Sequence, residues 1–478
     1  MTRQLLNHWW LFFIVLISGV KLVNLELVPL FGDEAAYCFW GTKVSHFGLV
    51  NSWEAMVSQG KIAPVLPFLQ SIAWLVLPQL RPVFLCRGVS VILSAATSFL
   101  VFWLTLKLSR RPLVGWAAML FYLLNPFSFF TDRTSLLEPA LNFFVLVVTS
   151  LVWLAVTRKQ LKLLLFGVIF LLVAVLTKLT ALLIIPGLMG IVWFSPLRLK
   201  QRWLVLGGLF LASLGLWWLV NFIGQWAVFG YHAHTGFELS GMMRRSASNL
   251  YLTRSWYEQY LTAGFFIVTL LGAWRLFKER QYGWLIFPIP MVVTYILLAD
   301  SYFPRFLLLT LPFLAVMVGY AVRTRVGQVI LAIMLVIWMA NDWQMIVRPA
   351  QARMAREDHW QFFEDWTSGV GTKAASEWLT QKGPVGIVVL PEDLLYRMEI
   401  HSLENKIKQN FSFLPIRDED DLKKKMKAGA LDDAILLTTT HHGWLQATFG
   451  SQYSLQPVYA SHGDTARSVL GYILLKID

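Results

Sequence analysis

The sequence has few charged residues and almost no cysteine. Asp, Glu, Lys and Arg make up 14% of its 478 residues, whereas a soluble domain has about 25%. Apolar residues make up 56%, and the mean hydropathy is +0.57. This composition excludes a soluble enzyme, a disordered chain and a coiled coil. The two cysteines, Cys38 and Cys86, have no metal-binding spacing and indicate no redox framework, which excludes a disulfide scaffold.

The charges are unevenly divided along the chain. Residues 1–348 hold 27 Lys and Arg against 11 Asp and Glu, whereas residues 349–478 hold 14 against 17. We therefore predict a polytopic membrane domain over 1–348 and a small soluble α/β domain over 349–478. In the second domain the patterns predict helices over 372–382 and 418–429, and strands over 385–390, 433–439 and 468–476.

Long apolar runs dominate the first domain. A run of about 20 apolar residues can cross a bilayer as a helix. Residues 64–79 are apolar but short and contain three prolines, so we interpret them as an interfacial or re-entrant helix. The remaining runs predict an all-α membrane domain of eleven transmembrane helices, at 9–30, 84–106, 113–131, 139–157, 161–177, 179–195, 203–229, 259–274, 283–299, 304–322 and 326–346.

Lys and Arg set the predicted orientation through the positive-inside rule. With 64–79 not spanning, the connections on one side hold fifteen Lys and Arg and a single acid, Glu279; they are residues 1–8, 107–112, 158–162, 198–202, 275–280 and 323–325. We predict this side to be cytoplasmic. The other ten acids, the long loops 31–83 and 230–258, and the C-terminal domain then lie outside. We expect a multi-pass protein of a bacterial inner or plasma membrane, with a cytoplasmic N-terminus, an extracytoplasmic C-terminus and its working face outside.

The first outer loop carries an acid pair and a lysine. Asp33 and Glu34 come just after the first span. Such a pair is often solvated or lies at a helix N-terminus, but acids near lipid usually face a cavity or a partner. Lys61 comes just before the proline-rich apolar segment. It can bind a lipid phosphate as a point charge or extend to the headgroups without a specific partner.

Further charged residues lie at the ends of the next spans. Glu138 begins the fourth span, where an acid is favourable near the helix N-terminus. Asp132 and Arg133, just before it, can pair with each other. Lys178 lies at the outer junction of two apolar runs, where we expect it to need a counter-charge.

Two more outer segments carry candidate ligands. Arg305 can bind a phosphate through two hydrogen bonds, or it can pair with Asp300. His232 and His234 form a weak metal-binding pattern. Together, carboxylates and cations at one face of one leaflet suit a reaction in which a lipid phosphate leaves and a hydroxyl attacks.

These motifs resemble those of the GT-C membrane glycosyltransferases, in particular the protein O-mannosyltransferase-like branch that includes the lipid A aminoarabinose transferases. The resemblance covers about residues 10–320. It rests on Asp33-Glu34-Ala35-Ala36-Tyr37, Lys61-Ile62-Ala63-Pro64, Arg87 at the entry of the second span, Glu138 in LLEPALNFF, Thr177-Lys178 with Ala181, and Pro304-Arg305-Phe306 with Pro312.

The resemblance implies transfer of a sugar from a polyprenyl-phosphate donor to a hydroxyl of an envelope glycan, lipid or protein at the outer leaflet. It implies that Asp33 acts as general base with Glu34 beside it, and that the anomeric configuration is inverted. The implied substrate-binding residues are Tyr37, Lys61, Arg87, Glu138, Lys178 and Arg305.

Among these residues, the three outer-face cations Lys61, Lys178 and Arg305 would hold the lipid phosphate. Glu34 and Glu138 would orient the acceptor or the sugar, or ligate a metal. Some relatives bind a divalent metal ion near this site, and its weak candidate ligands here are Glu138, His232 and His234. The predicted partners are the donor, the acceptor and membrane lipids, without nucleic acid.

Two other functions fit a polytopic membrane protein. A transporter or flippase of lipid-linked glycans is the main alternative, but the spans show no two matching halves with helices broken at the midplane. A non-catalytic assembly or sensor protein leaves Asp33, Glu34 and Lys61 unexplained. The identities of the sugar and of the acceptor stay open.

Overall fold

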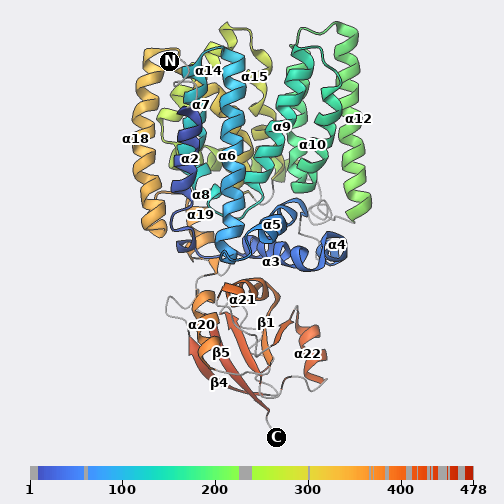
Figure 1. The fold of residues 1–478 in the computed structure, drawn as a ribbon, viewed down its shortest axis with the longest axis vertical. Helices are drawn as coiled ribbons and strands as arrows, with labels where there is room; N and C mark the ends of the chain where they lie inside the picture. The colour runs from blue at the N-terminus through green and yellow to red at the C-terminus, as the bar shows by residue number, and fades with distance from the viewer. Residues whose placement is uncertain are drawn as a thin grey trace. The chain divides into compact units, whose positions relative to one another are not determined.

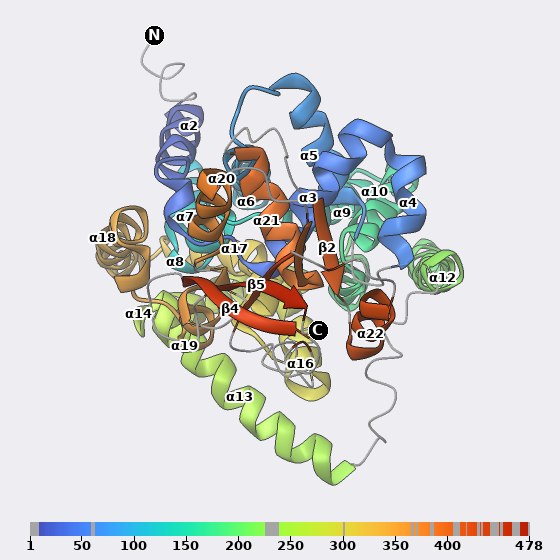
Figure 2. The same cartoon turned by 90° about the horizontal axis from the view of Figure 1, so that it is seen from below.

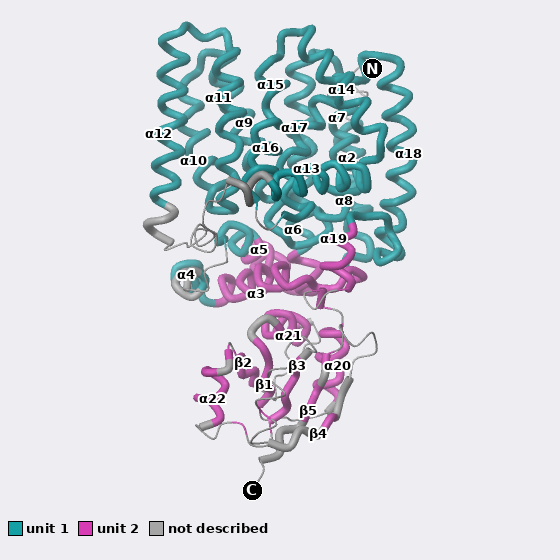
Figure 3. The backbone as a smooth tube through the Cα atoms, turned by 180° about the vertical axis from the view of Figure 1, so that it is seen from behind, with its two compact units in different colours: residues 1–25, 47–69, 87–355 teal, residues 26–46, 70–86, 356–478 magenta. Residues whose placement is uncertain are grey.

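The computed structural model describes residues 9–58, 63–224, 239–299, 302–364, 368–369, 371–382, 387–404, 412–416, 418–427, 431, 434–439, 449, 453–460 and 469–476. The chain divides into two compact units (Figure 3). The first comprises 1–25, 47–69 and 87–355, and the second comprises 26–46, 70–86 and 356–478. The chain passes from one to the other after Ala355, close to the predicted boundary. Residues 26–46 and 70–86, which include both ends of the predicted first outer loop, however, belong to the same unit as the C-terminal residues.

The first unit is helical, and most of its helices run side by side (Figure 1). Its elements are α2 (Trp9–Lys21), α4 (Leu49–Ser58), α7 (Pro112–Leu124), α8 (Pro126–Asp132), α9 (Glu138–Thr157), α10 (Leu163–Thr177), η2 (Leu179–Ile184), α11 (Ile185–Trp193), α12 (Leu199–Gly224), α13 (Leu239–Leu261), α14 (Gly264–Lys278), α15 (Tyr282–Ile286), α16 (Pro288–Leu298), η3 (Pro304–Thr310), α17 (Leu311–Ala321), α18 (Arg325–Val347) and η4 (Pro349–Gln351). Three further elements, η1 (Leu25–Leu27), α5 (Val65–Val76) and α6 (Pro82–Ser109), include residues of both units.

Six helices in the described part of the chain are long and apolar enough to cross a membrane, or up to eight if two bent pairs each count as one span. Shorter apolar helices occupy Leu163–Thr177, Leu179–Trp193 and Tyr282–Leu298, where three further spans were expected. The number of eleven spans therefore stays a prediction. Helix α5, with 12 residues, is about 18 Å long, too short for a hydrocarbon core of about 30 Å. A non-spanning helix was predicted there.

Helix α13 differs from the expectation of a long loop over 230–258. In Figure 2, where α12 and α18 are seen end-on, α13 is seen along its full length, so it runs across the direction of those helices. Its sequence is too polar for a span, and one side of it is buried, since Asn249, Thr253 and Trp256 are at most 6% exposed. On the exposed side, an Arg254–Glu258 ion pair at 2.8 Å supports the helix at i,i+4 spacing.

The second unit contains α3 (Gly32–Phe47), except for its last residue, and a five-stranded sheet in the order β2-β1-β3-β5-β4. Strands β2 and β3 pair parallel to β1, whereas β5 pairs antiparallel to β3 and β4. The remaining elements are α19 (Arg356–His359), η5 (Trp360–Glu364), α20 (Thr372–Lys382), β1 (Ile387–Pro391), α21 (Glu392–Glu404), β2 (Ser412–Ile416), α22 (Glu419–Lys427), β3 (Ile435–Thr439), β4 (Tyr453–Ala460) and β5 (Val469–Lys476).

The predicted helices and strands of this α/β part are present, with α20 at the predicted bounds. The sequence patterns predict none of α21, β2 and β4. Each of these strands contains a proline, Pro415 or Pro457, which weakens a strand pattern. Two apolar clusters form the core; Val389 and Leu436 belong to one, whereas Val388 and Ile435 belong to the other, because alternate residues of a strand point to opposite faces.

A disulfide corrects the interpretation of the two cysteines as carrying no redox framework. Cys38 of α3 and Cys86 of α6 are bonded to each other within the second unit, although they are 48 residues apart. Their spacing matches no motif because the pairing depends on how the loop folds back.

Candidate functional site

Three predicted site residues meet in the first unit. Glu138 is the first residue of α9, Lys178 lies at the break between α10 and η2, and Arg305 is the second residue of η3. The Lys178 Nζ lies 2.7 Å from the Glu138 Oε1, and Arg305 interacts electrostatically with the same carboxylate. Segments far apart in the sequence therefore bring one acid and two cations together.

Local backbone features place these side chains at helix ends. Pro139 and Pro304 each stand in the first turn of their helices, where proline needs no hydrogen-bond acceptor. Lys178 has an extended backbone conformation, with φ −163° and ψ 129°, which ends α10 before η2 begins. Elements η2 and η3 both pack against α9, so both cations reach its N-terminal end.

The Lys178 ammonium group is held by Glu138 but remains partly accessible. The Glu138 side chain is 5% exposed and the Lys178 side chain is 22% exposed. The Lys178 Nζ also lies 4.9 Å from the centre of the Phe306 ring, within the range of a cation–π contact. Glu138 supplies the counter-charge that the sequence predicts for Lys178. The remaining exposed fraction leaves the ammonium able to meet an anion.

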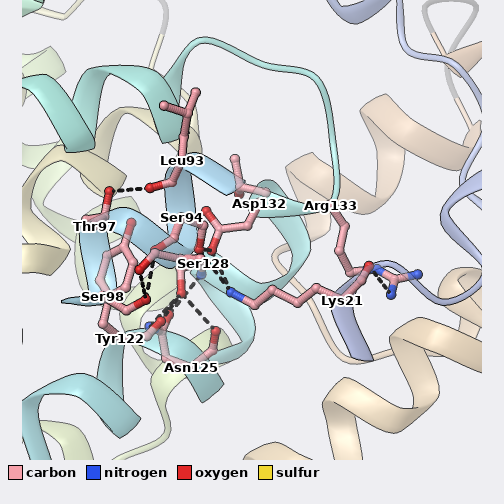
Figure 4. A network of polar contacts seen from close by, with 12 residues as sticks. Lys21, Leu93, Ser94, Thr97, Ser98, Tyr122, Asn125, Ser128, Asp132 and Arg133 are labelled. Atoms are coloured by element: carbon pink, nitrogen blue, oxygen red, sulfur yellow. Dashed lines mark hydrogen bonds and ion pairs between the residues drawn. The ribbon is translucent and has the colours of Figure 1, made fainter. Parts of the chain in front are cut away.

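A second group of buried charges lies in the same unit (Figure 4). The Lys21 Nζ lies 2.7 Å from the Asp132 Oδ2 and 3.3 Å from the Ser94 Oγ, and Ser94 donates to the same carboxylate. Lys21 is 0% exposed. Asp132 therefore pairs with Lys21, and the expected pairing with Arg133 is wrong.

Arg133 instead caps the C-terminal end of α2. Its guanidinium donates to the carbonyl oxygens of Lys21, Val23 and Asn24 at 3.0–3.4 Å. Burial, together with the nearby Arg87 guanidinium, lowers the pKa of Arg133 to about 10, although the Asp342 carboxylate opposes this shift. The group thus stays charged at neutral pH and compensates the partial negative charge of the helix end.

Lys21 and Asp342 are not among the predicted site residues. A lysine within an apolar run is nevertheless a sequence signal for a buried charge that needs a partner. Arg87 is fully buried, and its guanidinium donates to the carbonyl oxygen of Leu25. This contact is structural, and the substrate-binding role of Arg87 stays a prediction.

The acid pair of the first loop lies in the second unit. Helix α3 begins at Gly32, so Asp33 and Glu34 stand in its first turn, where carboxylates are favoured by the helix dipole. Asp33 is exposed, whereas Glu34 is fully buried and Tyr37 is 9% exposed. Of the two adjacent carboxylates, the first is the one accessible to a substrate.

Several contacts fix α3 within its unit. The Cys38–Cys86 disulfide ties its middle to the first residues of α6. Towards its C-terminal end the Lys43 Nζ lies 3.3 Å from the Glu399 Oε2 of α21, and the Phe39 and Tyr396 ring centres are 5.0 Å apart. The C-terminal α/β part therefore packs against the helix that carries Asp33.

Three predicted residues, Lys61, His232 and His234, lie outside the described residues. Among the residues that the structure describes, no group of three or more His, Cys, Asp or Glu side chains is placed to hold a metal ion. The metal site therefore stays a weak prediction.

Comparison with known proteins shows what this chain is similar to. The family model of dolichyl-phosphate-mannose-protein mannosyltransferase matches residues 63–237. The predicted resemblance is confirmed. The fold is similar to the crystal structure of ArnT from Cupriavidus metallidurans bound to undecaprenyl phosphate, with a TM-score of 0.57 over 97% of this chain and 98% of that chain, at 15% identity. No match in sequence is found among curated proteins. The chain thus has the ArnT-like fold and is a multi-pass membrane protein.

Proposed function

We propose that this protein transfers a sugar from a polyprenyl-phosphate donor to a hydroxyl group of an envelope glycan, lipid or protein. The observation that carries the proposal is the cluster of Glu138, Lys178 and Arg305 at helix ends. The mannosyltransferase family match over 63–237 and the ArnT-like fold support it.

In the proposed reaction, Lys178 and Arg305 bind the phosphate that links the sugar to the lipid. Negative charge grows on that phosphate as its bond to the anomeric carbon breaks, so preorganised cations favour the transition state over the ground state. Glu138 holds Lys178 in place through the 2.7 Å pair. Since a phosphate is a good leaving group, the step needs no dedicated acid.

Asp33 is the proposed general base. Its carboxylate takes the proton of the acceptor hydroxyl while that oxygen forms a bond to the anomeric carbon and polyprenyl phosphate leaves from the opposite side. The configuration at the anomeric carbon is thereby inverted. Asp33 suits this role because it is exposed on α3, whereas the neighbouring Glu34 is buried and suits positioning.

We place the reaction at the outer leaflet. The predicted charge bias puts the α3 loop and the C-terminal part outside, and the Cys38–Cys86 disulfide in that unit supports an oxidising compartment. A bacterial inner membrane with a cytoplasmic N-terminus fits both observations.

The test is transfer from undecaprenyl-phosphate sugars by the purified, reconstituted protein, with products identified by mass spectrometry. Asp33→Asn should lower kcat by about 10²–10⁴-fold, whereas Glu258→Gln, an exposed acid of α13, should leave it unchanged. Transfer by Asp33→Asn at the wild-type rate would exclude Asp33 as base. Movement of intact donor across vesicles with no covalent product would instead favour the transporter alternative.

The phosphate-binding role is tested separately. Lys178→Met alone leaves the buried Glu138 carboxylate without the ammonium group with which it forms an ion pair, so the informative variant is Lys178→Met combined with Glu138→Gln. It should raise KM for the donor more than KM for the acceptor. Arg305→Gln should do the same, and equal changes in both constants would contradict the assignment.

A further inference from the structure

A second charged cavity lies in the helical unit, at the opposite end of α9 from Glu138. Its volume is about 740 Å³, and it is lined by the ends of α6, α9 and α11 and by the start of α15. Four cations line it, Lys107, Arg110, Arg158 and Arg280, and its lining contains no acid among the described residues. Helix α9 has 20 residues, so the two sites are about 30 Å apart along it.

Within the part of the chain that the structure describes, the four cations have no counter-charge of their own. All four side chains are exposed, and none forms an ion pair within the described part of the chain. Neighbouring charges on the same face do pair, as Arg323 does with Glu279. Four like charges around one cavity repel each other, and an anion that binds among them offsets this repulsion.

Two of these cations occupy backbone positions that favour glycine. Arg110 and Arg280 follow the ends of α6 and α14 with φ of +56° each, in the left-handed region. Glycine would adopt this conformation with less strain. Arginine at both positions places a guanidinium at the cavity, and this planar group can bind a phosphate through two hydrogen bonds.

The surroundings of the cavity favour a lipid over a soluble anion. Trp153, Phe194 and Tyr282 line it, with the Phe194 and Tyr282 ring centres 5.4 Å apart. Nearby Trp193 is 43% exposed and Phe277 is 50% exposed. Aromatic side chains of this kind gather at membrane–water interfaces, at the level of the headgroups.

An apolar groove lies along the same helix. Its volume is about 340 Å³, and Val, Leu and Gly residues of α9, α10 and α12 and the α9–α10 connection line it. Val152 of α9 lines this groove, and Val156, one turn further along the same face of the helix, lines the basic cavity. A headgroup and an acyl chain of one molecule therefore have adjacent sites of matching chemistry.

We propose that the basic cavity binds the phosphate of an anionic membrane lipid in the leaflet opposite to the proposed sugar transfer. Its cations belong to the segments that the charge bias predicts to be cytoplasmic. Basic pockets between transmembrane helices on that side bind anionic headgroups. The proposal does not depend on the transfer reaction.

The experiment uses the full chain in detergent and measures thermal unfolding and native mass spectra with added phosphatidylglycerol, phosphatidylcholine or inorganic phosphate. The test variant is Arg110→Gln, Arg158→Gln and Arg280→Gln together. The matched control is Lys162→Gln, Arg198→Gln and Lys200→Gln, which removes three cations that do not line the cavity.

We expect phosphatidylglycerol, but not phosphatidylcholine, to raise the unfolding temperature and to remain bound in the spectra of the wild type and the control. The test variant should lose on the order of 100-fold in apparent affinity, and Arg→Lys at the three positions should restore most of it. Equal binding by the test variant and the control would overturn the site. Stabilisation by inorganic phosphate equal to that by phosphatidylglycerol would overturn the lipid assignment.

Discussion

The buried Lys21–Asp132 pair allows a quantitative test of how the helical unit is held together. The two side chains are 0% and 3% exposed, and their charged atoms lie 2.7 Å apart. At an effective dielectric constant of about 20, their attraction is about 6 kcal/mol. Much of this offsets the cost of removing both charges from water, so the pair adds little net stability relative to two apolar residues.

Removing only one partner should be far more damaging. Lys21→Met leaves the Asp132 carboxylate buried with Ser94 as its remaining hydrogen-bond donor among the described contacts, and should lower the free energy of unfolding by about 3–5 kcal/mol. Asp132→Asn should cost a similar amount. The double variant should cost clearly less than the sum, with a coupling energy of about 2 kcal/mol or more.

The assay is equilibrium unfolding of the purified protein in mixed micelles, followed by tryptophan fluorescence. The control cycle uses Arg254→Met and Glu258→Gln, because that pair is 73% and 43% exposed and should couple by less than about 0.5 kcal/mol. Additive effects of Lys21→Met and Asp132→Asn would refute the reasoning, since they would show that neither residue needs the other.

Three other contacts of the structure allow further tests. Replacing Cys38 and Cys86 by Ala should cost about 4 kcal/mol for a loop of 48 residues, and reductant should lower the melting temperature of the wild type but not of this variant. Arg133→Met should destabilise by about 2–3 kcal/mol because carbonyls at the end of α2 lose their donor, with Arg133→Lys intermediate in thermal melts. Burial raises the pKa of Tyr302 to about 12, so the folded state keeps a proton that the unfolded chain loses near pH ~10; stability should fall between those pH values, and less steeply in Tyr302→Phe.

Helix α3 and the C-terminal part belong to the same compact unit, which suggests a structural role for the C-terminal part. Because Lys43 and Phe39 of α3 contact Glu399 and Tyr396 of α21, the C-terminal part helps to position the helix that carries Asp33. The proposed base is thus supported by residues more than 350 positions away in the sequence.

The sequence by itself determined the features that depend on local pattern. Apolar runs mark where helices lie, prolines in 64–79 mark a helix too short to span, and residues 372–382 appear as α20 at the predicted bounds. The motifs also predict Glu138, Lys178 and Arg305 one by one as site residues, because charged residues at the ends of apolar runs are costly to place near lipid.

Only the tertiary structure decided which of these residues are partners. Asp132 and Arg133 are adjacent, yet Asp132 pairs with Lys21 and Arg133 binds the end of α2, since successive residues at a helix end point in different directions. The same holds for the Cys38–Cys86 bond and for the four cations of the basic cavity, which come from three separate segments of the chain. Such pairings depend on how helices pack, and local periodicity carries no information about contacts at long sequence separation.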